Sequence, residues 1–338
     1  MRKIDALLKL LVPEIQTAFL EAMAAISDGV VLAEITAAIE AGDYSKVYAL
    51  LNITNPVFRP LTRGLQDAFE RLADARVEEF PARLETPVGS IKFRFDVRNE
   101  RAETWLKQQS SDLVTRISDD VRNNIRNVMT DAIARGQNPR QTALDIVGRI
   151  DPATGKRVGG IVGLTKNQER WAASARRKLE SGDETYFDMA LRDKRFDATV
   201  RKAFASGKPL PADTVQKLIT RYKDNALRYR GEQIAITETI AALNKAEDES
   251  IRQAVASGAI RAQDVRREWD DVGDTHTRHT HRQMRGQTVG LDEPFVTPEG
   301  DRLMYPGDPS LGARASEIVG CRCRVKIIVD WLAKYGEG

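Results

Sequence analysis

The sequence predicts a mainly α-helical protein with multi-helix N-terminal and central regions and a small C-terminal α+β domain. Apolar residues recur every three or four positions over most of the 338 residues, which is typical of amphipathic helices. Clear alternation with period two, typical of a half-buried strand, is found only at 91–97 and 321–329. Aromatic residues make up just 6% of the chain, which argues against a large β-sandwich or barrel.

The composition excludes several classes of protein. Lys and Arg number 52 and Asp and Glu 49, so the net charge is only +3 and any basic surface must be local. No run reaches the roughly 18 uncharged apolar residues of a membrane span. Charges at Asp5, Lys9 and Glu14 interrupt the apolar N-terminal stretch, which argues against a signal peptide. With two cysteines the chain has no disulfide framework, and we expect synthesis in a reducing cytoplasm.

Changes of residue pattern predict three segments. Residues 1–83 form an N-terminal helical arm or bundle that packs on itself or, alternatively, docks on a partner. Residues 84–264 combine a strand with a central helical region, and residues 265–338 form the C-terminal α+β domain.

Local signals set the expected helix ends. Pro13 should begin a new helix or bend the first one. Gly136 and Asn138-Pro139 should stop the helix that starts near Glu103. The last long helix, at about 212–257, is expected to be interrupted near Gly231.

The alternating segment predicts a strand from Ile91 to Val97. Its apolar residues alternate with charged ones, so one face should be buried. A strand needs a partner, and the helical stretch that follows offers none. We therefore expect this strand to pair with the C-terminal α+β domain.

Residues 192–230 hold the main charge bias of the chain, with eleven Lys or Arg against four Asp. One interpretation is a solvated helix surface, and the other is contact with phosphates or an acidic partner. No base-reading motif is present, so DNA binding would be independent of sequence and sensitive to salt. The residues expected to contact DNA are Arg192, Lys194, Arg195, Arg201, Lys202, Lys217, Arg221, Lys223 and Arg228.

The three histidines (His276, His279, His281) and two cysteines (Cys321, Cys323) all lie near the C-terminal end. A zinc site formed by His281, Cys321 and Cys323 is one interpretation. The other is that both cysteines are small buried residues on one strand face. Same-face residues along a strand are about 6.6 Å apart, so two thiolates can share a zinc only if the strand bends. The same spacing argues against a disulfide between them.

The surrounding residues predict a structural polar cluster. Asp274 should cap a helix from Thr275 to about Arg285, with Arg278 and His281 on one face. Arg278 should pair with Asp308, and removal of metal should change little. The motif comprises Asp274, Arg278, His281, Gly286, Pro306, Gly307, Asp308, Cys321 and Cys323. No nucleophile elbow, phosphate loop or zinc-protease helix is present, so we expect no enzyme, with acid/base chemistry at His281 as the alternative.

These residues resemble the phage Mu F-like minor head proteins, also called head morphogenesis proteins, over roughly 91–326. The C-terminal part of the resemblance is Trp269, Asp274 to Arg278, His281, Gly286-Gln287, Glu293-Pro294-Phe295, Gly300, Tyr305 to Pro309 and Cys321-Arg322-Cys323. The upstream part is Phe95 to Asn99, Gly163-Leu164-Thr165, Gln168 and Ile236 to Thr239. Two positions depart from the family pattern. Gly320 stands where the family usually has Asn, and Arg278 and His281 stand where some relatives carry a Cys-x-x-Cys.

The resemblance implies a structural, low-copy component of a tailed-phage virion, inside the capsid, made in the host bacterial cytoplasm. Its implied partners are the portal protein, the major capsid or scaffold protein, and double-stranded DNA without sequence specificity; no membrane is implied. It would act in head morphogenesis, DNA packaging or ejection. No cofactor is expected, with zinc as the alternative. The alternative functions are a sequence-independent DNA-binding adaptor and a His/Cys metal-dependent hydrolase.

Overall fold

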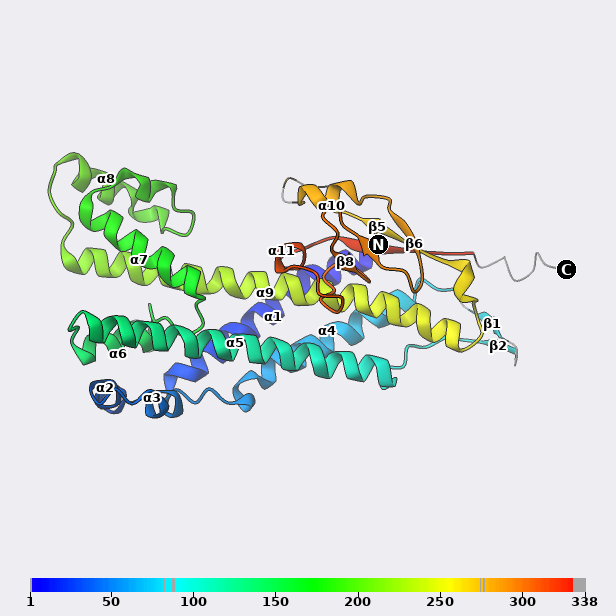
Figure 1. Ribbon diagram of the computed structural model, residues 1–338, viewed down its shortest axis with the longest axis horizontal. Coiled ribbons are helices and arrows are strands. Elements are labelled where there is room, and N and C mark those ends of the chain that lie inside the picture. Colours follow the sequence, from blue (N-terminus) through cyan, green and yellow to red (C-terminus); the bar gives the residue numbers. More distant parts are fainter. Residues whose placement is uncertain (1, 82, 87–88, 274, 276, 331–338) are drawn as a thin grey trace. The chain divides into compact units, whose positions relative to one another are not determined.

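The computed structural model describes residues 2–81, 83–86, 89–273, 275 and 277–330 (Figure 1). The chain forms two compact units, each built from separate stretches of sequence. Unit 1 comprises Met1–Gln16, Leu61–Ser110 and Glu232–Gly338, and unit 2 comprises Thr17–Pro60 and Ser111–Gly231. Long helices contribute residues to both units, and the three contiguous segments expected above stay a prediction.

Helices dominate both units, which confirms the predicted fold class. They are α1 (Arg2–Asp28), α2 (Leu32–Glu40), α3 (Tyr44–Leu50), α4 (Arg59–Val77), α5 (Glu100–Ala134), α6 (Pro139–Val147), α7 (Lys166–Ser181), α8 (Asp197–Ala205), α9 (Ala212–Ala256), α10 (His279–Gln283) and α11 (Ala315–Ile318). Short 3-10 turns occupy Asn55–Phe58, Glu184–Asp188, Lys194–Phe196 and Ala262–Asp264.

Helix α5 ends at Ala134, as the signals at Gly136 and Asn138-Pro139 predicted. Asn138 accepts hydrogen bonds from the first backbone N–H groups of α6, with Pro139 as its first residue. Thr165 and Gln168 form a capping box at the start of α7. Pro13 lies inside α1 and does not begin a new helix. The interruption expected near Gly231 is wrong, because α9 runs unbroken from Ala212 to Ala256 and a helical glycine costs only about 1 kcal/mol.

Helix α1 is long and apolar enough, by length and composition alone, to cross a membrane. Its buried residues nevertheless fall on one stripe. Ile4, Leu11 and Ile15 are buried in unit 1, and Phe19 and Met23 in unit 2. A single buried stripe is typical of an amphipathic helix that packs one face against the core of a globular protein.

The C-terminal α+β region of unit 1 is built on a three-stranded antiparallel sheet (Figure 1). β5 (Val265–Asp270) is central and pairs with β6 (Thr288–Gly290) and β9 (Arg324–Val329). β7 (Phe295–Val296) and β8 (Arg302–Leu303) form a separate hairpin. The core of the region contains the buried residues Trp269, Met284, Phe295, Tyr305, Cys321, Cys323 and Val325.

The segment expected to be a strand from Ile91 to Val97 is not one. β1 (Leu84–Thr86) and β2 (Gly89–Ile91) form a hairpin, and residues 92–96 pair with no strand. Burial does alternate along these residues, and the ring of Phe93 stacks on Phe80 with centroids 5.4 Å apart. The Gln253 carboxamide of α9 bonds the backbone of Asp96, accepting from its N–H at 2.8 Å and donating to its carbonyl at 2.9 Å. A helix side chain thus takes the place of the expected neighbouring strand.

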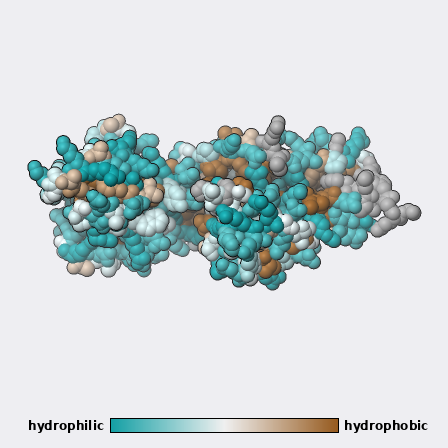
Figure 2. All heavy atoms as spheres, turned by 90° about the horizontal axis from the view of Figure 1, so that it is seen from above, coloured by the Kyte–Doolittle hydropathy of each residue, from teal (hydrophilic) through white to brown (hydrophobic). Residues whose placement is uncertain are grey.

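Apolar side chains that remain exposed are scattered. Hydrophilic residues cover most of the face seen in Figure 2, and hydrophobic residues form small patches on it. Among the described residues, exposed apolar side chains such as Leu10, Ile133 and Trp171 lie on different helices. Isolated residues of this kind are normal on a protein surface and identify no docking face.

Stability should depend on pH through Glu247 of α9. Burial raises the pKa of its carboxyl group to about 7, and the nearby charges of Arg76, Glu79 and Arg324 have smaller effects. Because the folded-state pKa lies above the unfolded value, the free energy of unfolding should fall as pH rises from about 4.5 through 7. We expect Glu247→Gln to raise Tm by several degrees at pH 8 and to change it little at pH 5.

Thermal unfolding followed by circular dichroism at the two pH values checks this expectation. Glu40→Gln, at an exposed position of α2, is the matched control and should leave Tm unchanged at both. An equal change in the Tm of Glu247→Gln at both pH values contradicts the role given to its ionisation.

Candidate functional site

The structure brings His281, Cys321 and Cys323 together in one buried cluster. Nδ1 of His281 lies 3.5 Å from Sγ of Cys321 and 3.4 Å from Sγ of Cys323. The three atoms all lie within 4.8 Å of one another. The side chains are 1%, 2% and 3% exposed, respectively, so bulk water does not reach the cluster.

Both thiols can reach the same imidazole because the cysteines precede strand β9 instead of lying within it. The residue before them, Gly320, has φ +70°, in the left-handed region. Its N–H donates to Oγ1 of Thr237 on α9 at 2.8 Å, which fixes the turn. The spacing of a straight strand, which argued against a shared ligand, therefore does not apply here.

The other side of the His281 ring faces an acidic side chain. Nε2 lies 2.9 Å from Oε2 of Glu317 on α11, close to it but without the angle of a hydrogen bond. Oγ1 of Thr280 donates to the same carboxylate oxygen at 2.9 Å. The Trp269 ring packs edge-to-face on the imidazole, with centroids 5.1 Å apart. These contacts hold Nδ1 toward the two sulfur atoms.

The two thiols affect each other's ionisation. A hydrogen bond from Cys323, helped by His281, lowers the pKa of Cys321 well below its usual value, against the effect of burial. The hydrogen bond to Cys321 and burial raise the pKa of Cys323. In the absence of a cation the pair therefore favours one thiolate over two.

Asn244 of α9 is a site residue that the sequence analysis missed. Its fully buried Nδ2 donates to the carbonyl oxygens of Pro306 at 2.9 Å and Cys323 at 3.2 Å, and its Oδ1 accepts from the N–H of Val325 at 2.9 Å. The sequence does contain a signal for this residue: it is an amide side chain on the apolar face of a long helix. A buried amide must find hydrogen-bond partners.

The polar cluster differs from its predicted form. Helix α10 starts at His279 with Arg278 at the N-cap position, later than the expected start at Thr275. Asp274, the predicted cap, lies outside the described residues. Arg278 donates to the carbonyl of Val319 and does not pair with Asp308.

The carboxylate of Asp308 instead accepts hydrogen bonds from residues of its own turn. Its carboxylate accepts from the N–H groups of Met304 and Ser310, each at 2.9 Å, and from the Ser310 hydroxyl at 2.8 Å. The predicted Arg278–Asp308 pair is wrong because these local donors use the carboxylate. Gly286 and Gly307 have φ +77° and +86°, so the two motif glycines occupy left-handed positions.

Several of the residues expected to contact DNA are engaged within unit 2. Arg192 forms an ion pair with Asp197 at 3.0 Å, and Arg195 with Asp193 at 2.6 Å. The guanidinium of Arg201 lies 4.0 Å from the centroid of the Phe187 ring, and the ammonium of Lys217 lies 5.2 Å from that of Phe196. Exposed positions in the segment are Lys194, Arg195, Arg201, Lys202, Lys208, Lys217 and Arg228.

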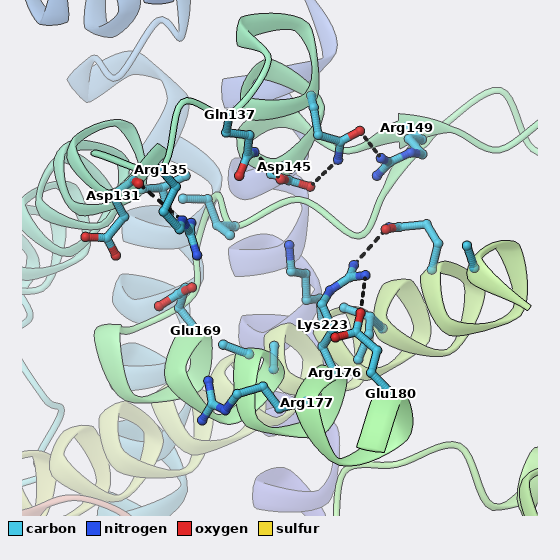
Figure 3. Close-up of a pocket in the computed structure, with 18 of the residues that line it drawn as sticks. Asp131, Arg135, Gln137, Asp145, Arg149, Glu169, Arg176, Arg177, Glu180 and Lys223 are labelled. Carbon is cyan, nitrogen blue, oxygen red and sulfur yellow. Dashed lines mark hydrogen bonds and ion pairs between the residues drawn. The ribbon is translucent and has the colours of Figure 1, made fainter. Parts of the chain in front are cut away.

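Lys223 points into a pocket of about 760 Å³ in unit 2 (Figure 3). The pocket is also lined by Arg149, Arg176, Asp145 and Glu169, so its charges are mixed. Burial lowers the pKa of Lys223 and raises that of Glu169. A second pocket of about 480 Å³ is lined in part by Arg221, Lys223 and Arg228. Arg221 and Lys223 thus line hollows and, unlike Arg228, are not among the exposed basic positions of the segment.

The turn at Gly320 generates a specific prediction. An added Cβ would approach only Oε1 of Gln233, at 2.7 Å, the end of a flexible side chain. Asn tolerates the left-handed region and Val does not. Gly320→Asn, which restores the usual family residue, should therefore change the free energy of unfolding by less than about 1 kcal/mol. Gly320→Val should lower it by roughly 1–3 kcal/mol. Urea unfolding of both variants measures the difference, and equal losses contradict the conformational explanation.

Comparison with known proteins shows what these features are similar to. Residues 194–326 match the family described as Phage Mu protein F like protein. The uncharacterized protein YqbB of Bacillus subtilis (strain 168) is 34% identical over 106 residues, which cover 30% of this chain and 32% of YqbB. The chain thus matches about a third of that relative's length, and no solved structure matches. The family match includes all of α9, most of the C-terminal sheet and the His281–Cys321–Cys323 cluster, and over residues 194–326 this chain is similar to the phage Mu F-like proteins.

Proposed function

We propose that this chain is a structural minor head protein of a tailed bacteriophage. The family match over residues 194–326 carries the proposal, because it supports a head morphogenesis protein and a component of the virion. In the proposed role the protein lies inside the capsid and contacts the portal protein and the major capsid or scaffold protein. It acts there in head morphogenesis, DNA packaging or ejection.

The use of the motif residues supports a structural role. Asp308 accepts three local hydrogen bonds, and Asn244 joins α9 to the chain at Pro306 and Cys323. His281 is 1% exposed, which leaves no room for a substrate at its ring. Burial of the imidazole therefore disfavours the alternative of a His/Cys metal-dependent hydrolase, in which a reacting group must meet its substrate.

Contact with double-stranded DNA belongs to the proposal as a second element. The exposed basic residues around α8, including Lys194 and Lys202, support it, because they present positive charge without a base-reading motif. The same residues also favour the alternative function, a sequence-independent DNA-binding adaptor outside the virion. The location of the protein distinguishes these two functions.

Composition of purified virions tests the structural role. Quantitative mass spectrometry of density-purified phage particles should find a few copies of this chain per head, protected from protease added outside. Phage lacking the gene should yield fewer DNA-filled heads, with rescue from a plasmid. Absence of the chain from intact virions overturns the head-protein proposal and leaves the adaptor.

Charge reversal tests the DNA contact. Lys194→Glu with Lys202→Glu should weaken binding to a random duplex at least tenfold at low salt and reduce the slope of log affinity against log salt. Lys9→Glu with Lys46→Glu changes the net charge equally at exposed positions elsewhere and should have a much smaller effect. Fluorescence anisotropy measures both. Equal losses in the two double variants, or an affinity independent of salt, contradict a DNA contact in this segment.

A further inference from the structure

We propose that His281, Cys321 and Cys323 bind a zinc ion through the imidazole Nδ1 and the two thiolates. Zn–S bonds of about 2.3 Å and Zn–N bonds of about 2.0–2.1 Å place a sulfur and a nitrogen of one tetrahedral site roughly 3.5 Å apart. The two sulfur-to-Nδ1 distances are 3.5 and 3.4 Å. The two sulfur-to-nitrogen separations thus already match edges of a zinc coordination tetrahedron.

The convergence of two sulfurs on one nitrogen distinguishes this site from simple packing. A neutral imidazole has one acceptor nitrogen with one lone pair, so it can accept a good hydrogen bond from only one thiol. Buried cysteines that served only as small apolar residues would have no reason to place both Sγ atoms beside Nδ1. A shared cation accounts for both short distances together.

The rest of the His281 environment suits a ligand. Metal-bound histidines commonly place their second ring nitrogen beside a carboxylate, which sets the tautomer and the ring orientation. Oε2 of Glu317 lies 2.9 Å from Nε2 and is itself held by Thr280. With Glu317 beside Nε2, Nδ1 is the ring nitrogen that faces the two sulfur atoms.

Charge balance also fits a buried zinc. Two thiolates neutralise the two positive charges of the ion, so the cluster buries no net charge at the three ligands. The described residues place no other His, Cys, Asp or Glu ligand atom in this cluster. Arg278 does not coordinate, since its guanidinium donates to Val319. Asp274 and His276 lie outside the described residues.

The bound ion would stabilise the small C-terminal core. That core is formed by few large apolar side chains, among them Trp269, Phe295 and Tyr305. Small folds with limited apolar burial commonly depend on a metal or another cross-link. Zinc here would join α10 to the start of β9, which lie about 40 residues apart in sequence, and this role does not depend on the proposed head function.

Metal analysis of the intact chain tests the site. Protein produced in zinc-supplemented medium and purified under reducing conditions should contain one zinc per chain by mass spectrometry. Removal of zinc by a strong chelator should lower Tm, and added zinc should restore it. Replacement by Co²⁺ should produce the thiolate-to-cobalt absorption expected for two cysteine ligands.

Variants separate the ligands from their neighbours. Cys323→Ser and His281→Gln should reduce zinc to a small fraction of one per chain, whereas His279→Gln, an exposed position on the same helix, should retain it. Glu317→Gln should keep the site but weaken zinc affinity by about 10- to 100-fold. A folded wild-type chain that binds neither Zn²⁺ nor Co²⁺, with a Tm insensitive to chelator, overturns the proposal and makes the cysteines core residues only.

Discussion

The carboxamide of Asn244 is the interaction on which the C-terminal part of unit 1 depends. From one side chain on α9 it donates to the backbone carbonyls of Pro306 and Cys323 and accepts from the N–H of Val325. It thereby fixes the proline turn, the cysteine segment and the first residues of β9 against the same helix. Since the amide is fully buried, any replacement that leaves these backbone groups without partners would cost the desolvation energy of each.

Other side chains of α9 also form hydrogen bonds with the backbone of segments far away in the sequence. Gln253 bonds both backbone groups of Asp96, and Thr237 accepts from the N–H of Gly320. A side chain of the sheet acts in the same way. The buried guanidinium of Arg267 on β5 donates to the backbone carbonyls of Gly290, Met304 and Glu293. Short strands and turns leave many peptide groups without neighbours. In unit 1, polar side chains from the helix and from β5 supply the missing partners.

Sequence reasoning succeeded where a single local rule determines the structure. Helical periodicity located the helices, and the signals at Gly136 and Asn138-Pro139 located the end of α5, because glycine and proline act on the adjacent helix turn. The alternation at 91–97 failed because it reports which face is buried and carries no information on what satisfies the backbone. The Arg278–Asp308 pair failed because opposite charge does not show that nearer donors already occupy the carboxylate. Both cysteines reach His281 because the chain turns at Gly320. The sequence argument assumed the residue spacing of a straight strand, which does not hold at such a turn.

The division of the chain into interleaved units has a consequence for the order of folding during synthesis. All of unit 2 lies before residue 232, whereas unit 1 needs both the N-terminal stretch and the segment that begins at Glu232. A ribosome therefore releases the whole of unit 2 before unit 1 has its last stretch, although the first turns of α1 can already contact α4 through pairs such as Arg71–Glu14. Domains fold as units once their residues have emerged. Unit 1 can be completed only after every residue of unit 2 has been synthesised.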